Sequence, residues 1–210
     1  MRKVLFILFN LYVINSFSQN NNPVIPFEIF FGNNRINNQI NVNKNIKGKF
    51  FFQNISTAAV DYKNTLIENE VIMMNSLNYQ FHKHINIGTG LRYHYLKGII
   101  PNLSMSFTYF NPTWTFILSP CLELLPKRNL EFASIIEFKP KLTENIRLYS
   151  RIQGLYNQNL IDNLHDRSFL NFRLGLKINN IMFGAATNLD NYGPHKFYKD
   201  NYGVFFRIEI

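Results

Sequence analysis

The chain has one cysteine, and after its first residues it has no apolar run long enough to cross a membrane as a helix. A lone cysteine cannot form an internal disulfide, so Cys121 does not covalently hold this fold. A transmembrane helix needs about 20 mostly apolar residues, and helical membrane insertion is therefore excluded. The GxSxG, HExxH and glycine-rich phosphate-binding patterns are also missing. Motifs thus assign no catalytic residue, no metal site and no cofactor, and they favour a protein that is not an enzyme.

Acidic residues are scarce beside basic ones. The sequence has 22 Lys and Arg against 13 Asp and Glu, which gives a formal net charge of +9. This charge suits anionic lipid headgroups or anionic solutes, and no nucleic-acid-binding pattern accompanies it. No low-complexity linker and no repeat of roughly 20–50 residues divides the chain, which predicts one domain.

The segment 1–18 has the three parts of a secretory signal peptide. A positive start precedes an apolar core over 4–14, and Ser16 and Ser18 supply the small residues that a signal peptidase reads. The apolar core is too short to span a bilayer. We therefore expect export and cleavage, which leaves 19–210 as the mature domain.

Alternation of apolar and polar residues is the strongest signal in the mature chain, and it continues to the last residue. One face of the final segment has Tyr202, Val204, Phe206, Ile208 and Ile210, and the other has Gly203, Phe205, Arg207 and Glu209. Successive side chains of a β-strand point to opposite faces, so this segment is a strand with one apolar side. The same pattern recurs over 86–96, 102–109, 113–123, 130–139, 146–156 and 170–178.

Less regular segments complete the set of predicted strands. They lie at 27–32, 49–53, 57–63, 71–81 and 181–189. The total is about twelve strands, or about ten if the opening hairpin packs elsewhere. Tight turns are expected near 54–56, 82–83, 111–112, 141–144 and 179–180, and longer connections at 33–45, 97–100, 124–128, 158–166 and 190–200. Outer-membrane barrels alternate short turns with long loops, and an even strand number leaves both termini on the periplasmic side.

Alternation alone does not distinguish a membrane barrel from a soluble, lipocalin-like barrel with its apolar face inward. Aromatic residues near the predicted strand ends favour the membrane, because such rings suit the headgroup belts: Tyr79, Phe81, Tyr93, Tyr95, Tyr109, Trp114, Phe138, Tyr156 and Tyr202. The polar face also carries Gly, Ser, Thr and Asn between its charges, as an enclosed lumen requires. The prediction is an all-β, closed antiparallel transmembrane β-barrel.

The final strand, Tyr202–Ile210, resembles the C-terminal insertion signal that the barrel assembly machinery reads. The whole mature chain is similar to small bacterial outer-membrane β-barrel proteins. The resemblance implies an outer-membrane location, contact with its lipids, and the assembly machinery as a partner during insertion. The final residue departs from that pattern, because Ile210 stands where an aromatic residue is common.

The polar faces of the predicted strands place charged residues in the lumen. Candidates to line a constriction are Arg92, Arg147, Arg151, Arg173, Arg207, Glu131, Glu137 and Glu209. Such charges could pair across strands and fill a narrow barrel, or form a cationic constriction that favours anionic solutes. The main hypothesis is a narrow pore or solute-specific channel. The alternative is a structural or adhesion barrel with a plugged interior and partner-binding external loops.

The predicted loop over 190–200 mixes aromatic and charged residues. Tyr192, His195, Lys196 and Tyr198 suit contact with sugars, lipid headgroups or a partner surface. The simpler interpretation is a loop folded over the barrel mouth.

A weaker hypothesis is a surface hydrolase. Asp162, His165, Asp166 and Ser168 lie together in another predicted external loop, and hydrolases combine a His with a nucleophile and an orienting group. A solvated loop of ordinary composition explains the same residues, and no catalytic residue is assigned from them.

Overall fold

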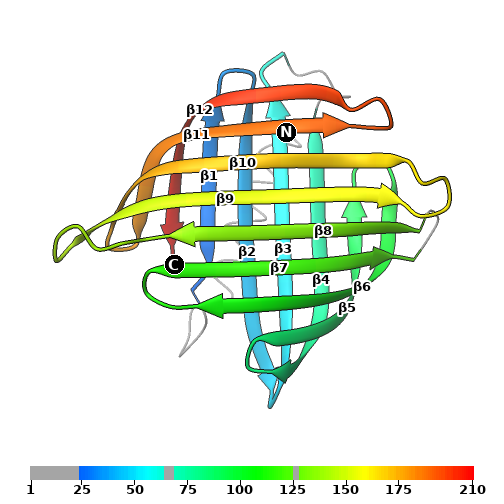
Figure 1. The fold of residues 1–210 in the computed structure, drawn as a ribbon, viewed down its shortest axis with the longest axis horizontal. Coiled ribbons are helices and arrows are strands. Elements are labelled where there is room, and N and C mark those ends of the chain that lie inside the picture. The colour runs from blue at the N-terminus through cyan, green and yellow to red at the C-terminus, as the bar shows by residue number, and fades with distance from the viewer. Residues whose placement is uncertain (1–23, 64–68, 125–127) are drawn as a thin grey trace, which may run out of the picture.

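The computed structural model describes residues 24–63, 69–124 and 128–210, and they form a closed antiparallel barrel (Figure 1). Its strands are β1 Pro26–Gly32, β2 Arg35–Lys47, β3 Phe50–Asp61, β4 Glu70–His82, β5 Ile85–His94, β6 Gly98–Phe110, β7 Trp114–Glu123, β8 Asn129–Phe138, β9 Ile146–Asn159, β10 His165–Ile178, β11 Ile181–Tyr192 and β12 Phe197–Glu209. Each strand pairs with the next, and β1 pairs with β12 to close the ring. The predicted signal peptide over 1–18 and its cleavage site lie outside the described residues.

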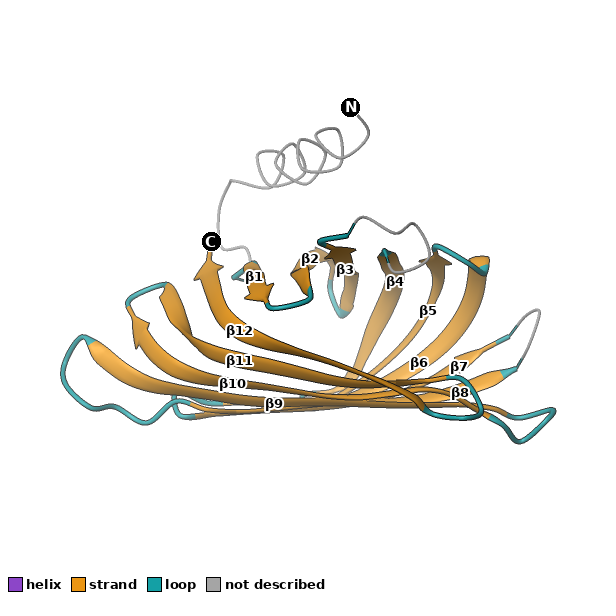
Figure 2. Cartoon of the chain, turned by 90° about the horizontal axis from the view of Figure 1, so that it is seen from above, coloured by secondary structure: helices purple, strands orange, loops and turns teal. Residues whose placement is uncertain are grey.

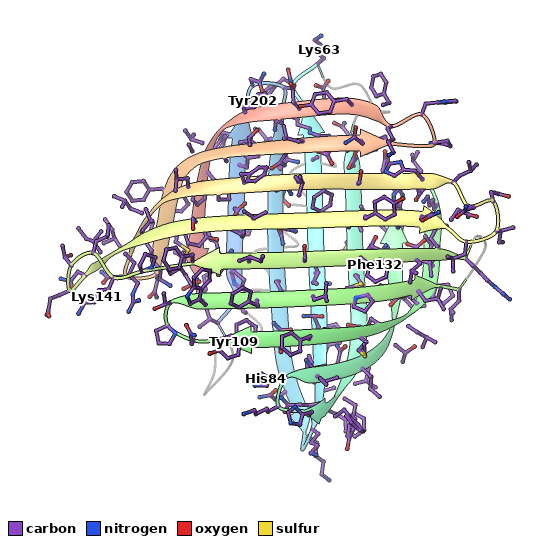
Figure 3. The ribbon with its side chains drawn as sticks, viewed as in Figure 1. Lys63, His84, Tyr109, Phe132, Lys141 and Tyr202 are labelled. Carbon is purple, nitrogen blue, oxygen red and sulfur yellow. The ribbon has the colours of Figure 1, made fainter. Side chains whose placement is uncertain are left out.

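The strands tilt around the barrel, so that β8–β11 on the near wall run across β2–β4 on the far wall (Figure 1). Seen from above, β7–β11 form a broad wall that faces β1–β4 across the interior (Figure 2). Ile25 and Ile210 exchange backbone hydrogen bonds of 2.8 and 3.0 Å, and we call their end of the barrel the terminal end. The opposite end is the distal end. Lys141 and Lys63 mark the terminal and distal ends in Figure 3.

The apolar stripes face outward, and the charged residues are enclosed. Leu170 and Leu174 on β10 are 48% and 58% exposed, whereas Arg173 on the same strand and Arg151 on neighbouring β9 are 4% and 3% exposed. A soluble barrel would reverse these values. Closure also satisfies the backbone donors and acceptors of every strand internally, as a lipid environment requires. The predicted all-β transmembrane barrel of twelve strands is confirmed.

The strand count was right although two early assignments were wrong. The predicted loop over 33–45 lies mostly in β2, and the predicted turn at 54–56 lies inside β3, so 49–53 and 57–63 are parts of one strand. Asparagine favours turns and is depleted in strands, which made this Asn-rich region look like a loop. The amides are used within the sheet instead. Gln53 Nε2 donates to Asn43 Oδ1 at 3.0 Å, and Asn54 Nδ2 to Asn75 Oδ1 at 2.8 Å.

The predicted tight turns at 82–83, 111–112 and 179–180 are short connections in the structure, but the predicted contrast with long loops is weaker than expected. The strands β11 and β12 extend to Tyr192 and from Phe197, which reduces the expected loop over 190–200 to a four-residue turn. The tight turn at 179–180 is as predicted, and Asn179 there has a φ of 51°. Asparagine tolerates this left-handed conformation better than most residues, which suits it to a two-residue hairpin.

Two connections extend beyond the described residues, at 64–68 and 125–127. Within the described ranges, no helix has the length and hydropathy needed to cross a membrane.

Candidate functional site in the barrel interior

The interior of the barrel is charged because the polar residues of its alternating strands point inward. Enclosed ions are tolerated only when they are paired and hydrogen-bonded. The ions of this barrel fall into clusters at different heights between the distal and terminal ends.

The distal cluster joins opposite walls of the barrel. Nη1 of Arg167 on β10 lies 3.1 Å from Glu70 Oε2 on β4, and its Nη2 lies 2.9 Å from Asp190 Oδ1. Arg35 Nη2 lies 2.7 Å from the other Asp190 oxygen, and both arginines donate to the Tyr192 hydroxyl. Between β4 and β10 lie β5–β9 in one direction and β11, β12 and β1–β3 in the other. The Glu70–Arg167 pair therefore crosses the lumen.

The side cluster is centred on Arg92 of β5. Its Nη1 and Nη2 contact the two oxygens of Glu131 at 2.8 and 2.6 Å, and Nη1 also lies 2.6 Å from Glu123 Oε1. Asn157 Nδ2 donates to Glu131 Oε2 at 3.0 Å. The two parallel Arg–carboxylate bonds fix both position and orientation. This cluster lies against the wall formed by β5–β9.

The central cluster gives one carboxylate to two arginines. Glu28 Oε1 on β1 lies 2.7 Å from Arg151 Nη2 on β9 and 2.8 Å from Arg173 Nε on β10. Arg173 also donates to Asn188 Oδ1 at 2.9 Å, and its guanidinium lies 4.7 Å from the centre of the buried Phe30 ring. This stacking adds cation–π attraction to the charge pairing. The cluster places positive charge at mid-height in the barrel.

Glu137 on β8 accepts hydrogen bonds from three groups. Arg207 Nη1 lies at 3.1 Å, Lys139 Nζ at 2.8 Å, and the Tyr149 hydroxyl donates to it at 3.0 Å. The Tyr149 ring is fully buried and lies 5.6 Å from the Phe205 ring in a small apolar cluster inside the barrel. Side chains therefore fill part of the lumen at this height.

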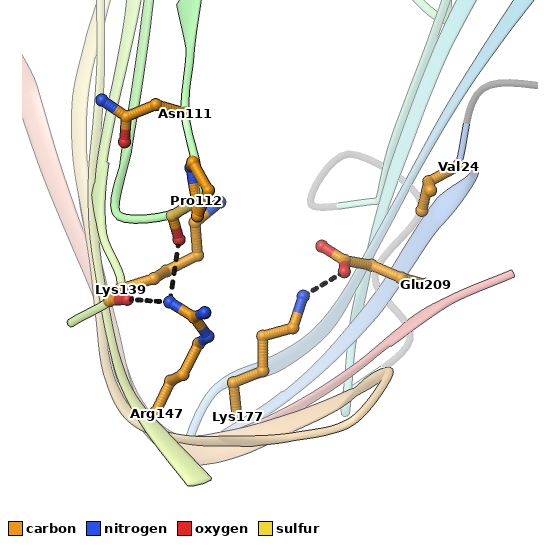
Figure 4. A pocket seen from close by; sticks show the side chains of 7 residues that line it. All are labelled: Val24, Asn111, Pro112, Lys139, Arg147, Lys177 and Glu209. Carbon is orange, nitrogen blue, oxygen red and sulfur yellow. Dashed lines mark hydrogen bonds and ion pairs between the residues drawn. The ribbon is translucent and has the colours of Figure 1, made fainter. Parts of the chain in front are cut away.

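A pocket of about 340 Å³ opens near the terminal end. Its ionic lining is Lys139, Arg147 and Lys177 against one carboxylate, that of Glu209. Figure 4 shows the Arg147 guanidinium beside the carbonyl oxygens of Pro112 and Lys139, both at 3.1 Å, and facing the Lys177–Glu209 pair. We call this the terminal pocket. Its excess of positive charge and its two kinds of cationic donor suit a carboxylate or phosphate group.

The structure places the predicted lumen residues as follows. Arg92 and Glu131 are in the side cluster, and Arg151 and Arg173 are in the central cluster. Arg207 and Glu137 contact each other in the group around Glu137, and Arg147 and Glu209 line the terminal pocket.

The four residues predicted for external contact lie in different parts of the structure. The hydroxyl of Tyr192 belongs to the distal cluster, because β11 extends further than expected. His195 and Lys196 lie exposed in the β11–β12 turn. Tyr198 lies on β12 with 52% of its surface exposed.

His165 and Asp166 do not act together as the hydrolase hypothesis required. The Asp166 carboxylate lies 2.5 Å from Lys97 Nζ and accepts a hydrogen bond of 3.0 Å from Asn129. His165 instead contacts Gly193 and Ser168. A register shift between His165 and Arg167 explains the separation, because a bulge changes which side successive residues face.

Sequence reasoning missed several interior ions. Glu28 lies between Phe27 and Ile29 in an alternating segment, and that local pattern could have identified it. Arg35 and Asp190 fell in stretches predicted to be loops, and Arg167 fell just after one. No local pattern marks these as interior residues.

An apolar exterior around a paired, charged interior is the arrangement of a transmembrane β-barrel. No protein-family model matches the sequence, and no curated protein matches it significantly. Among solved structures, the KdgM porin is similar with a TM-score of 0.51 and 11% identity, over 90% of this chain and 99% of that one. A KdgM porin in complex with disordered oligogalacturonate gives 0.50 and 11%, over 90% and 99%. The NanC porin gives 0.49 and 9%, over 89% and 99%. At these identities the likeness concerns the fold.

Proposed function

We propose that this protein is a narrow outer-membrane channel that favours small anionic solutes. The observation that carries the proposal is the terminal pocket, where Lys139, Arg147 and Lys177 line an entrance to the barrel with Glu209 as the one carboxylate of the lining. Lys139 is paired in addition with Glu137, and Arg147 contacts only carbonyl oxygens among the bonds of its guanidinium described above. Charged groups at a constriction select ions of opposite sign, and a low-dielectric wall strengthens their field.

The arginines of the interior continue this positive lining towards the distal end. Arg207, Arg151 and Arg173 follow the pocket in that direction, and each is paired with a carboxylate that could exchange for a passing anion. One similar barrel was solved in complex with oligogalacturonate, a polyanion. This supports an anionic solute here and does not identify it.

A second candidate function is a plugged barrel that serves as a structural or adhesion protein. The Glu70–Arg167 pair favours it, because this 3.1 Å contact crosses the lumen. In this case the exposed His195 and Lys196 of the β11–β12 turn would be candidate contacts for a partner. In the channel the same pair would form a constriction of the path.

Conductance in planar bilayers distinguishes the two functions. We expect the wild type to give discrete ohmic steps and a reversal potential, under a KCl gradient, that shows anion preference. The double variant Arg147→Gln/Lys177→Gln should lose most of that preference, because it leaves Glu209 in a pocket with one cation. The matched control is Lys83→Gln, which removes an exposed cation from a turn at the same end. If folded protein produces no current steps in the bilayer, the channel proposal is refuted and the plugged barrel remains.

A further inference from the structure

The outer face of the barrel carries a serine and a histidine in direct contact near the distal end. His165 Nε2 lies 3.0 Å from Ser168 Oγ, and His165 Nδ1 lies 2.7 Å from the carbonyl oxygen of Gly193. A carbonyl oxygen can only accept, so Nδ1 carries the proton. In the neutral ring Nε2 is then the acceptor, and the Ser168 hydroxyl donates to it. This is the tautomer that a general base needs beside a nucleophilic serine.

Ser168 lies on the lipid-facing side of the wall, and His165 beside it is only 7% exposed. Ser168 is two residues before Leu170 on β10, which is 48% exposed, and it pairs across the sheet with Tyr156, which is 43% exposed. The His165 ring lies 5.6 Å from the ring of Tyr156. The bulge after His165 turns Asp166 towards the interior, where it binds Lys97, and leaves the histidine outside.

A third polar residue lies across the sheet from Ser168. Asn191 on β11 is the direct cross-strand partner of Ser168. Side chains of directly opposed residues have Cβ atoms about 4.5–5.5 Å apart, within reach of a group bound at Ser168. The amide of Asn191 can therefore donate to an oxyanion that forms there, which is the role of such donors in acyl transfer.

The aromatic residues around the pair indicate its depth in the membrane. Tyr156 lies beside it, and Tyr198 is the cross-strand partner of Asn191. Tyrosines on the outer surface of a membrane barrel lie at the level of the lipid headgroups. The ester bonds of a glycerophospholipid lie at the lower boundary of this layer, next to the first carbons of the acyl chains.

We propose that Ser168 and His165 form a catalytic dyad that hydrolyses acyl esters of membrane lipids. Ser168 Oγ bonds to the ester carbonyl carbon while its proton passes to His165 Nε2. The bond from that carbon to the glycerol oxygen then breaks, and His165 returns the proton to the departing alcohol. Water cleaves the acyl-serine in the second step, with His165 again taking and returning a proton. The products are a lysolipid and a free fatty acid. The activity is independent of any passage through the lumen.

A covalent probe tests the nucleophile directly. The folded full-length protein in detergent is treated with a fluorophosphonate, which forms an oxygen–phosphorus bond to an activated serine and releases fluoride. We expect mass spectrometry to locate the adduct on Ser168. Wild-type protein that carries no adduct there would overturn the dyad.

Hydrolysis is measured as fatty acid released from dioleoylphosphatidylcholine in mixed micelles. Ser168→Ala and His165→Asn should each lower the rate at least ~100-fold, since a positioned general base contributes about that much or more. The matched control is Ser150→Ala, because Ser150 lies on the same face of neighbouring β9 and donates to a backbone carbonyl, that of Phe138, at 3.2 Å. Each variant is first shown to be folded by its heat-modifiable gel mobility. Equal release by wild type and Ser168→Ala would also refute the proposal.

Discussion

At the scale of single residues, the interior of this barrel depends on carboxylates that are shared between cations. Glu28 is the clearest case, since one of its oxygens accepts from both Arg151 and Arg173, and its side chain is 5% exposed. Removing one member of an enclosed ion pair leaves a charge that has already lost its hydration. The cost therefore falls on the partners that remain.

We expect Glu28→Gln to lower the free energy of unfolding by about 3–5 kcal/mol, because two enclosed arginines lose their counter-ion while the side-chain shape is kept. Urea titration of the protein in lipid vesicles measures the effect. The control is Glu144→Gln, whose carboxylate is 94% exposed and lies 3.8 Å from Lys141. Exposed pairs contribute about 0–1 kcal/mol. Equal effects in the two variants would contradict this account of the interior.

At the scale of elements, the barrel closes through a short first strand. β1 ends at Gly32, opposite Gly203, whereas β12 continues beyond it towards the distal end as far as Phe197. The fully buried Asn201 of β12 bridges this part of the seam. Its Oδ1 accepts from the backbone of Asn34 and Arg35 at 3.0 and 3.3 Å, and its Nδ2 donates to the Arg35 carbonyl at 2.9 Å. One amide side chain thus replaces missing ladder contacts.

The close approach of Asn201 to Gly32 predicts that the effects of substitutions at these two positions depend on each other. Asn201→Ala should cost about 1–3 kcal/mol, because enclosed backbone groups lose their partner. Gly32→Ala should also destabilise, since a Cβ at this position would lie 2.1 Å from Asn201 Oδ1. In the double variant that clash is absent. The sum of the stability losses of the two single variants should therefore exceed the loss measured for the double variant. Strict additivity in urea titrations would mean that the two residues do not meet.

At the scale of the whole molecule, the arrangement is one that resists denaturation by detergent. Apolar side chains face outward while the backbone is bonded strand to strand around a closed ring. Such a barrel has no free edge at which unfolding or pairing with another chain can begin.

We expect the protein to fractionate with the outer membrane and to run faster on SDS gels before boiling than after it. N-terminal sequencing of this fraction should begin at or near Gln19, because the expected signal peptide precedes it. Recovery in the soluble periplasmic fraction, with one mobility under both conditions, would contradict the membrane location.

The sequence predicted the local features of this barrel better than its contacts between distant strands. The alternating segments predicted β5–β10 and β12 and their faces well, since alternation is a local property. The Asn-rich β2 and β3 were divided wrongly, because their composition is that of turns and their amides pair only with neighbouring strands. Of the candidate site, the sequence identified Arg151 and Arg173 as interior residues but did not identify Glu28 as their common partner.

By itself, the sequence determined that the chain is a strand-rich barrel with one apolar and one charged face. Tertiary structure decided which charges meet. Arg151 and Glu28 are 123 residues apart, and they come into contact only because the ring closes between β1 and β12. The same holds for Glu70 and Arg167, which cross the lumen from opposite walls. The face of each side chain follows from the period of a strand, whereas its partner depends on the register and closure of the whole sheet.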